Sequence, residues 1–350
     1  MNIELTNRLI KKMAGLKQNI ADSMSMSILE PYIDGSKIQS GNIVTNKEAR
    51  ELLKTYSVNN HPINPYVFDQ CIPNVDTIHA IDLLQNPYLK NIVLKPLSIG
   101  DLKLETAFYA KNELAIINEP LQTDDLLRKF PIGIFDDTAF TYVLKNKDFV
   151  WMSICPMEIN TMYKHIKSAK GKVLVFGGGL AYYPYMISLK ENVSEITIIE
   201  SDERIFNIIN DIVLPQFKNH KAKIILYEAE QYIKDNNLSY YDTVFFDIWE
   251  DNISGAEYMK KFAKYELKYP EIQFQYWLED SILDSFIINI AEYFSAKLGT
   301  DEYQDFFCKV APDIWEYMES IGNIIKRPSQ LDYYLTRDFV KKYVLGVIDT

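Results

Sequence analysis

The strongest constraint on the fold is an apolar segment that ends in three glycines. Residues 172–181 read Lys-Val-Leu-Val-Phe-Gly-Gly-Gly-Leu-Ala, and a second apolar segment ends in Glu200, 21 residues after Gly179. Glycines let a backbone approach a ligand closely, and a carboxylate at the next strand end can accept both hydroxyls of a ribose. The sequence therefore predicts an α/β sheet that binds a nucleoside-containing ligand.

The second half of the chain alternates strand-like and helix-like segments. Such alternation is typical of a mainly parallel sheet covered by helices on both faces. We predict a doubly wound, Rossmann-like sheet followed by helices in place of further strands. The predicted strands are Lys172–Phe176, Glu195–Ile199, Lys223–Leu226, Thr243–Phe246 and Gln273–Trp277. The predicted helices are Tyr182–Leu189, Asp202–Leu214, Glu230–Asp235, Ala256–Tyr265, Ser281–Phe294, Tyr303–Ile321 and Thr336–Val344.

The first half has different periodicity. Residues 1 to about 90 predict helices, including a short one at Thr77–Leu84, and strand-like alternation follows up to residue 150. Leu102–Tyr109 and Leu114–Ile117 are separated by four residues, which predicts a β-hairpin. The change of period predicts two domains: residues 1–150, a helical and β-hairpin lid or substrate domain, and residues 151–350, a ligand-binding domain with a helical C-terminal extension.

Composition narrows the function classes. The net charge is −11 and the basic residues are scattered, which disfavours nucleic acid as a partner and suits cationic or neutral small substrates or a protein partner. Three widely spaced cysteines, Cys71, Cys155 and Cys308, fit a reducing compartment and show no metal-binding spacing. No apolar run approaches the roughly 18 residues that cross a bilayer, and the first 20 residues lack a signal-peptide core. We expect a cytoplasmic protein with no metal and no membrane segment.

Candidate site residues lie directly after the predicted strands, where ligands bind in a doubly wound sheet. Three glycines alone can be a tight turn, but glycines or carboxylates at four successive strand ends predict one ligand site. Two phosphate-binding alternatives are disfavoured. Tyr182 stands where a dinucleotide fingerprint requires glycine, and no Gly-Lys-Ser/Thr follows the glycines. The residues predicted to contact the ligand are Gly177, Gly178, Gly179, Glu200, Ser201, Glu228, Ala229 and Asp247.

Four segments resemble the class I S-adenosylmethionine-dependent methyltransferase superfamily, and within it the spermidine-synthase-like branch. That branch shows V-L-x-x-G-G-G-D-G at the first strand, V-E-x-D at the second, G-D-A or a near variant after the third, and Y-D-x-x-x-x-D after the fourth. This sequence has VLVFGGGLA at 173–181, IESD at 199–202, YEA at 227–229 and YDTVFFD at 241–247. The resemblance covers roughly residues 150 to 280.

The resemblance implies S-adenosylmethionine as cofactor and a role for each matching residue. Gly177 and Gly179 would border its methionine part, and Glu200 would hold the ribose. Glu228 would reach the adenine amine, and Asp247 would face the reacting centre. We therefore expect a methyltransferase acting on a small-molecule or protein acceptor.

Departures from the pattern make the match to one member of the branch, the aminopropyltransferases, weaker. Aminopropyltransferases have an aspartate where this chain has Leu180, and that aspartate handles the amine of decarboxylated S-adenosylmethionine. The last glycine of the turn is Ala181, and Ile248 and Trp249 replace small hydroxyl residues beside Asp247. Aminopropyl or related alkyl transfer remains an alternative, as does a catalytically idle nucleoside-binding protein.

The acceptor side of the site is predicted from residues near Asp247. Asp247 is the candidate proton acceptor or substrate anchor, and the alternative is a helix cap or a satisfied polar group. Trp249, Glu250 and Asp251 are candidate substrate-binding residues, although Trp249 can equally pack against the N-terminal domain. Glu158 can bond the cofactor's ammonium group or simply favour the start of its helix. A row of apolar residues at 283–294 fits core packing or a homodimer face.

Overall fold

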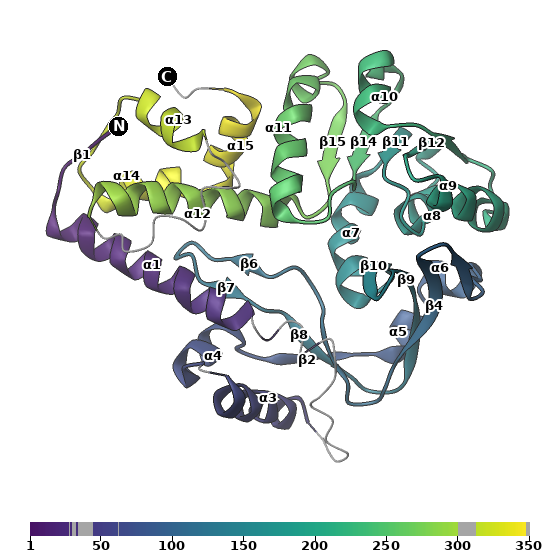
Figure 1. The fold of residues 1–350 in the computed structure, drawn as a ribbon, viewed down its shortest axis with the longest axis horizontal. Helices are drawn as coiled ribbons and strands as arrows, with labels where there is room; N and C mark the ends of the chain where they lie inside the picture. Colours follow the sequence, from purple (N-terminus) through teal and green to yellow (C-terminus); the bar gives the residue numbers. More distant parts are fainter. Residues whose placement is uncertain (28, 30–32, 34–44, 62, 300–312, 348–350) are drawn as a thin grey trace.

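The computed structural model describes residues 1–27, 29, 33, 45–61, 63–299 and 313–347. Its C-terminal half contains a sheet of five parallel strands in the order β13-β12-β11-β14-β15, of which β11, β12, β14 and β15 are labelled at the upper right of Figure 1. This third-second-first-fourth-fifth order belongs to doubly wound nucleotide-binding folds, so the predicted fold class is confirmed. The strands are β11 (Gly171–Phe176), β12 (Val193–Glu200), β13 (Ala222–Leu226), β14 (Thr243–Phe246) and β15 (Gln273–Tyr276).

Helices cover both faces of this sheet, because alternate side chains of each strand point to opposite faces. Val173 and Val175 of β11 pack with α7, α8 and α9, whereas Leu174 and Phe176 pack with α10, α11 and the C-terminal helices. A π turn and a 3₁₀ turn continue α9 as far as Gln216. The covering helices are α7 (Pro156–Ser168), α8 (Tyr182–Ser188), α9 (Glu203–Ile208), α10 (Ala229–Asp235) and α11 (Asn252–Lys268).

After β15 the described chain adds helices and no further strand to this sheet, as predicted. The predicted helix at 303–321 is described only from residue 313, and the rest lies outside the described residues. A two-residue strand β16 (Ile324–Ile325) pairs in parallel with β1 (Asn2–Ile3), so the two ends of the chain lie together. The C-terminal helices are α12 (Glu279–Lys297), α13 (Ile314–Ser320), α14 (Pro328–Tyr334) and α15 (Arg337–Leu345).

The N-terminal half combines short helices with antiparallel and mixed sheets. One sheet has the order β10-β9-β4-β3, a second β2-β8-β5, and β6 pairs with β7. The helices are α1 (Asn7–Ser27), α3 (Asn46–Asn60), α4 (Pro65–Cys71), α5 (Ala80–Leu84) and α6 (Pro87–Asn91). The strands are β2 (Val75–Ile78), β3 (Leu97–Ile99), β4 (Leu102–Tyr109), β5 (Leu114–Ile116), β6 (Leu121–Gln122), β7 (Arg128–Lys129), β8 (Ile132–Phe135), β9 (Ala139–Asn146) and β10 (Phe149–Ser153).

Two predictions for this half are wrong. The strands β4 and β5 do not form a hairpin with each other, because β4 pairs with β3 and β9 while β5 pairs with β8. Alternation marks a strand but does not select its partner, which depends on distant segments. The predicted helix at Thr77–Leu84 is wrong at its start, because residues 77 and 78 belong to the strand β2 and the helix α5 covers only Ala80–Leu84.

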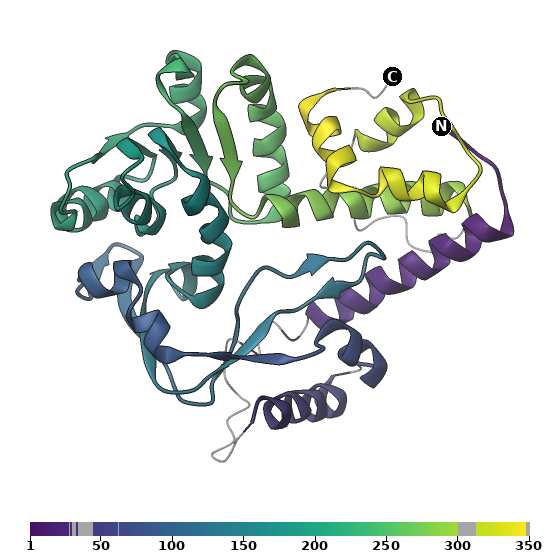
Figure 2. The ribbon, with the colours of Figure 1, turned by 180° about the vertical axis from the view of Figure 1, so that it is seen from behind.

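Hydrophobic packing crosses the predicted boundary at residue 150. Leu9, Met13 and Leu16 of α1 lie in the same cluster as α12, α14 and α15. In Figures 1 and 2, α1 runs along the edge between these C-terminal helices and the strands β6 and β7. The division at residue 150 stays a prediction. No helix in the described ranges is long and apolar enough to span a bilayer.

Candidate functional site

The turn after β11 requires glycine at its first position. Gly177 has φ +89°, and a Cβ there would lie 1.9 Å from the backbone oxygen of Asp247. Gly178 is crowded as well, since a Cβ would lie 2.3 Å from Cδ1 of Ile209. Gly179 has φ +52° but open space around it, with the nearest atom, Sδ of Met152, at 3.9 Å. The backbone of β11 therefore runs close to β14 and then opens toward free space, as a ligand-binding turn does.

The rest of the turn is held from outside the sheet. Ala181 adopts a left-handed conformation, φ +58°, which alanine rarely takes. The hydroxyl of Tyr88, on α6, donates to the backbone oxygen of Leu180. Tyr88 also packs edge-on against Tyr182 and Tyr185 of α8. The N-terminal half thus supports the glycine turn directly.

Glu200 ends β12 and faces this turn. Its carboxylate accepts hydrogen bonds from the backbone N–H of Gly178, at 2.8 Å, and of Asp202, at 2.9 Å. Burial raises the pKa of Glu200, and the backbone donors oppose that shift because they stabilise the ionised form. Each carboxylate oxygen has further lone pairs for a ligand hydroxyl. The predicted ribose-binding residue therefore also fixes the glycine turn.

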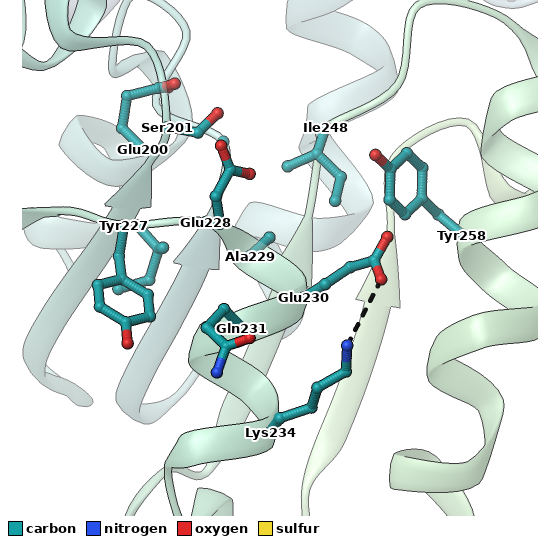
Figure 3. A pocket seen from close by; sticks show the side chains of 12 residues that line it. Glu200, Ser201, Tyr227, Glu228, Ala229, Glu230, Gln231, Lys234, Ile248 and Tyr258 are labelled. Carbon is teal, nitrogen blue, oxygen red and sulfur yellow. Dashed lines mark ion pairs between the residues drawn. The ribbon is translucent and has the colours of Figure 1, made fainter.

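A cavity of about 550 Å³ opens beside Glu200 (Figure 3). Its walls come from the ends of β12 and β13, from α10, and from Tyr258 of α11, which lies across from Ile248. Glu230 and Lys234 form an ion pair at its outer side, with 3.8 Å between their charged atoms. It is lined by Gly177, Ile199, Glu200, Ser201, Tyr227, Glu228, Ala229, Glu230, Gln231, Lys234, Ile248 and Tyr258.

A second cavity, of about 420 Å³, continues on the other side of the glycine turn. Four residues line both cavities: Gly177, Glu200, Ser201 and Ile248. The second cavity is bounded by β10, α7, α8 and the segment after β14. Its aromatic side chains are Phe149, Trp151, Tyr182, Tyr183, Phe245, Trp249 and Trp277, and its carboxyl groups belong to Glu158, Glu200, Asp202, Asp247 and Glu250.

Two of these carboxyl groups have strongly perturbed pKa values. Burial, with a smaller contribution from the charge of Glu200, raises the pKa of Asp247 to about 7. Burial, with a smaller contribution from the charge of Asp247, raises the pKa of Glu158 to about 8, although Ser153 donates hydrogen bonds to it. No described residue donates a hydrogen bond to the side chain of Asp247. Perturbed carboxyl groups in a cavity are candidates for proton transfer or cation binding.

Four of the other predicted residues line one of the two cavities, and Asp251 does not. Glu228 and Ala229 line the first cavity, and Trp249 and Glu250 line the second. Trp249 is buried, and its indole N–H has no partner among the described residues. Asp251 lines neither cavity: it caps α11, where its side chain accepts from the backbone N–H and the hydroxyl of Ser254.

Sequence reasoning missed two parts of the site. The strand β10 forms a wall of the second cavity, and Trp277 reaches it from the end of β15 while donating to the hydroxyl of Thr161 at 3.0 Å. The position of Trp277 directly after the fifth strand was an available signal. Nothing in the sequence places β10 beside the glycine turn, because that contact joins distant segments.

The residues present fit a phosphate-free nucleoside that carries positive charge. Among the described residues that line the two cavities, Lys234 is the only one with a positive charge, and Glu230 pairs with it. A pyrophosphate would face carboxylates without a cationic partner. A ligand with a ribose, a sulfonium and an ammonium group would instead meet hydrogen-bond acceptors and carboxylates. S-Adenosylmethionine has this set of groups.

Comparisons with known proteins give only distant likenesses. No protein-family model and no curated protein matches the sequence. Spermidine synthase from Thermotoga maritima aligns over 60% of this chain and 81% of its own, with 14% identity and a TM-score of 0.30. A candidate tRNA (m1A22) methyltransferase from Streptococcus pneumoniae aligns over 54% of this chain and 97% of its own, with 12% identity and a TM-score of 0.27. A protein of the NADB-Rossmann superfamily from Streptococcus agalactiae aligns over 54% and 96%, with 10% identity and a TM-score of 0.27.

These likenesses assign neither a reaction nor a substrate. The sheet itself is informative, because its strand order, its parallel pairing and the glycine turn at the end of β11 are all described. On that topology, residues 171–276 form a Rossmann-like, doubly wound α/β fold.

Proposed function

We propose that the protein is an S-adenosylmethionine-dependent methyltransferase. One observation carries the proposal: the cavity beside Glu200 shares four lining residues, at the glycine turn, with a second cavity that holds two carboxyl groups with raised pKa values. A donor site and an acceptor site that share one wall are what group transfer between two substrates requires.

The first cavity is proposed to hold the nucleoside. Glu200 accepts from the ribose hydroxyls, and Glu228 and Ala229 border the adenine. The turn at Gly177–Gly179 leads from the first cavity into the second and borders the methionine part. Asp247 then supplies negative charge on the side where the cofactor's sulfonium lies.

Bound S-adenosylmethionine supplies an electrophilic methyl carbon. The Asp247 carboxylate would hold the acceptor and take its proton, so that the freed lone pair could bond to that carbon while the carbon–sulfur bonding pair would stay with sulfur. A pKa of about 7 suits Asp247 to this step, because a base works best when its pKa lies near the working pH. The aromatic walls exclude water from the reacting atoms.

Isothermal titration calorimetry tests the proposal. S-Adenosylmethionine and S-adenosylhomocysteine should bind saturably, and Glu200→Ala should weaken binding by about 1.5–3 kcal/mol, the scale for losing a charged hydrogen-bond partner. Glu203→Ala, an exposed carboxylate that lines neither cavity, is the matched control and should change little. Melting curves of each variant are needed, since Glu200 also holds the turn.

Other titration results would redirect the proposal. No binding at millimolar ligand would reject the cofactor, and binding of NAD instead would favour a dehydrogenase. A preference of tenfold or more, about 1.4 kcal/mol, for decarboxylated S-adenosylmethionine would favour aminopropyl transfer. The side chain of Leu180 gives no carboxylate for that amine, so we expect no such preference. Binding without any transfer would favour the catalytically idle alternative.

A further inference from the structure

We propose that the acceptor is an amphipathic primary amine, with its ammonium group between Asp247 and Glu158 and its apolar chain running along β10 to the cavity mouth. This inference rests on the proposed function, because it names the substrate class of that acceptor site. It separates this protein from enzymes that take a diamine with charge at both ends.

The inner end of the second cavity selects a cation. Asp247 and Glu158 lie close enough for the charge of Asp247 to raise the pKa of Glu158. No described residue that lines this cavity carries a positive charge. Two ionised carboxyl groups in a desolvated site without a counter-charge repel each other, and a bound cation relieves that repulsion. An ammonium group has three donors for their oxygens.

The walls suit both a cation and a hydrocarbon. Trp151, Trp249 and Trp277 line the cavity from three different segments. Indole faces attract an ammonium group and also bury apolar surface. The wall from Tyr183 is rigid, since its ring stacks on Phe245 at 3.9 Å between centroids and its hydroxyl donates to Gln275.

The strand β10 connects the acidic inner end with an apolar mouth. At one end, Ser153 donates hydrogen bonds to Glu158. At the other end, Phe149 is 73% exposed and Val150 is 45% exposed, although both line the cavity. Four residue steps along a strand cover about 13 Å. Large exposed apolar side chains at a cavity mouth are unfavourable in water and are covered when an apolar ligand binds.

A diamine fits this arrangement less well. With one ammonium group at Asp247, its second would be near Phe149 and Val150, which offer no carboxylate. Glu250 also lines the cavity but is exposed, so water already solvates its charge and an added ion pair there gains little.

A series of amines tests this inference by calorimetry. Butylamine, hexylamine and octylamine are titrated into the protein with and without saturating S-adenosylhomocysteine. Affinity should rise about three- to fourfold for each added methylene that is buried, and hexylamine should bind tighter than 1,6-diaminohexane. Asp247→Asn should weaken all monoamines about tenfold or more by removing the charge that faces the ammonium group.

Two exposed phenylalanines provide a matched pair of variants. Phe149→Ser should reduce the gain in affinity that each added methylene of the amine gives. Phe108→Ser, at a residue that is 75% exposed on β4 of the same sheet and lines neither cavity, should leave it unchanged.

The same titrations test the cofactor and the acceptor class separately. Failure of S-adenosylhomocysteine to bind rejects the proposed cofactor, while the amine series on the ligand-free protein still tests the acceptor class. Tighter binding of the diamine, affinity that does not depend on chain length, or no amine binding in either titration would overturn the inference.

Discussion

At the scale of single residues, glycine is required more strictly at some positions of the glycine turn than at others. Gly177 combines a left-handed backbone with a Cβ position 1.9 Å from the Asp247 oxygen, whereas Gly179 has the left-handed backbone alone. Gly177→Ala should therefore destabilise the protein by about 3 kcal/mol or more, because backbone strain and overpacking add. Gly179→Ala should cost only about 1–2 kcal/mol. Urea unfolding measures both variants, and equal losses would contradict the role of the close contact.

Asp247 should make stability depend on pH. Its pKa is raised from the unfolded value of about 4 to about 7, so between these values the folded state binds more protons than the unfolded state. The stability that this proton provides is fully present below pH 4 and is lost as pH rises through 7. From pH 5 to 8, the free energy of unfolding should therefore fall by about 1–2 kcal/mol more in the wild-type protein than in Asp247→Asn. This is less than the full shift in pKa would give, because water in the cavity screens the charge.

Asp251→Asn is the control for this pH series. Hydrogen bonds from Ser254 lower the pKa of Asp251, so its contribution is lost only in acid, as pH falls through that lowered value. Between pH 5 and 8 the free energy of unfolding of this variant should change with pH as it does in the wild-type protein. Equal slopes for wild-type protein and Asp247→Asn would show that the Asp247 carboxyl is ordinary.

The predictable part of the site is the part that local sequence determines. Glu200, Glu228 and Asp247 were found because they follow strands, and parallel strands end at one edge of the sheet. The aromatic wall from Trp151 and the support from Tyr88 were missed. Both depend on how the N-terminal half packs against the turn, which no local pattern encodes.

At the scale of elements, strands buried on both faces were easier to predict than strands in antiparallel sheets. The central strands β11 and β14 hold buried apolar runs, Val173–Phe176 and Val244–Phe246, which is typical of strands in the middle of a parallel sheet. The error at β4 and β5 arose because an antiparallel strand can pair with several partners of similar pattern. The position of β10 beside the second cavity was not predicted either, because it depends on contacts between distant segments.

One ion pair joins three elements that are distant in sequence. Arg337 of α15 makes two contacts with the buried carboxylate of Asp284 on α12, at 2.7 and 2.8 Å, and Asp284 accepts from the backbone N–H of Gln122 in β6. Arg337→Leu should cost about 3–5 kcal/mol, because it leaves a buried charge without its partner. Thermal and urea unfolding measure the loss.

The double variant Arg337→Leu with Asp284→Asn tests the cause of that loss. A neutral amide can still accept from Gln122, so the double variant should recover most of the stability. A double variant as unstable as Arg337→Leu alone would show that packing of the arginine, and not the unpaired charge, dominates.

At the scale of the whole molecule, the two ends of the chain stabilise each other. The pairing of β1 with β16 and the packing of α1 on α12 place apolar side chains between Met1 and Ile20 in the C-terminal hydrophobic cluster. The same N-terminal half supplies Tyr88 to the glycine turn and β10 to the second cavity. We propose that the acceptor site exists only when both halves are folded, because neither half contains all of its walls.

A crystal structure with S-adenosylhomocysteine tests the central claim most directly. We predict ribose hydroxyls at the carboxylate of Glu200, adenine beside Glu228 and Ala229, and the sulfur near Gly177, where the two cavities share a wall, facing Asp247. Nucleoside density elsewhere in the molecule, or with the sulfur turned away from Asp247, would contradict it.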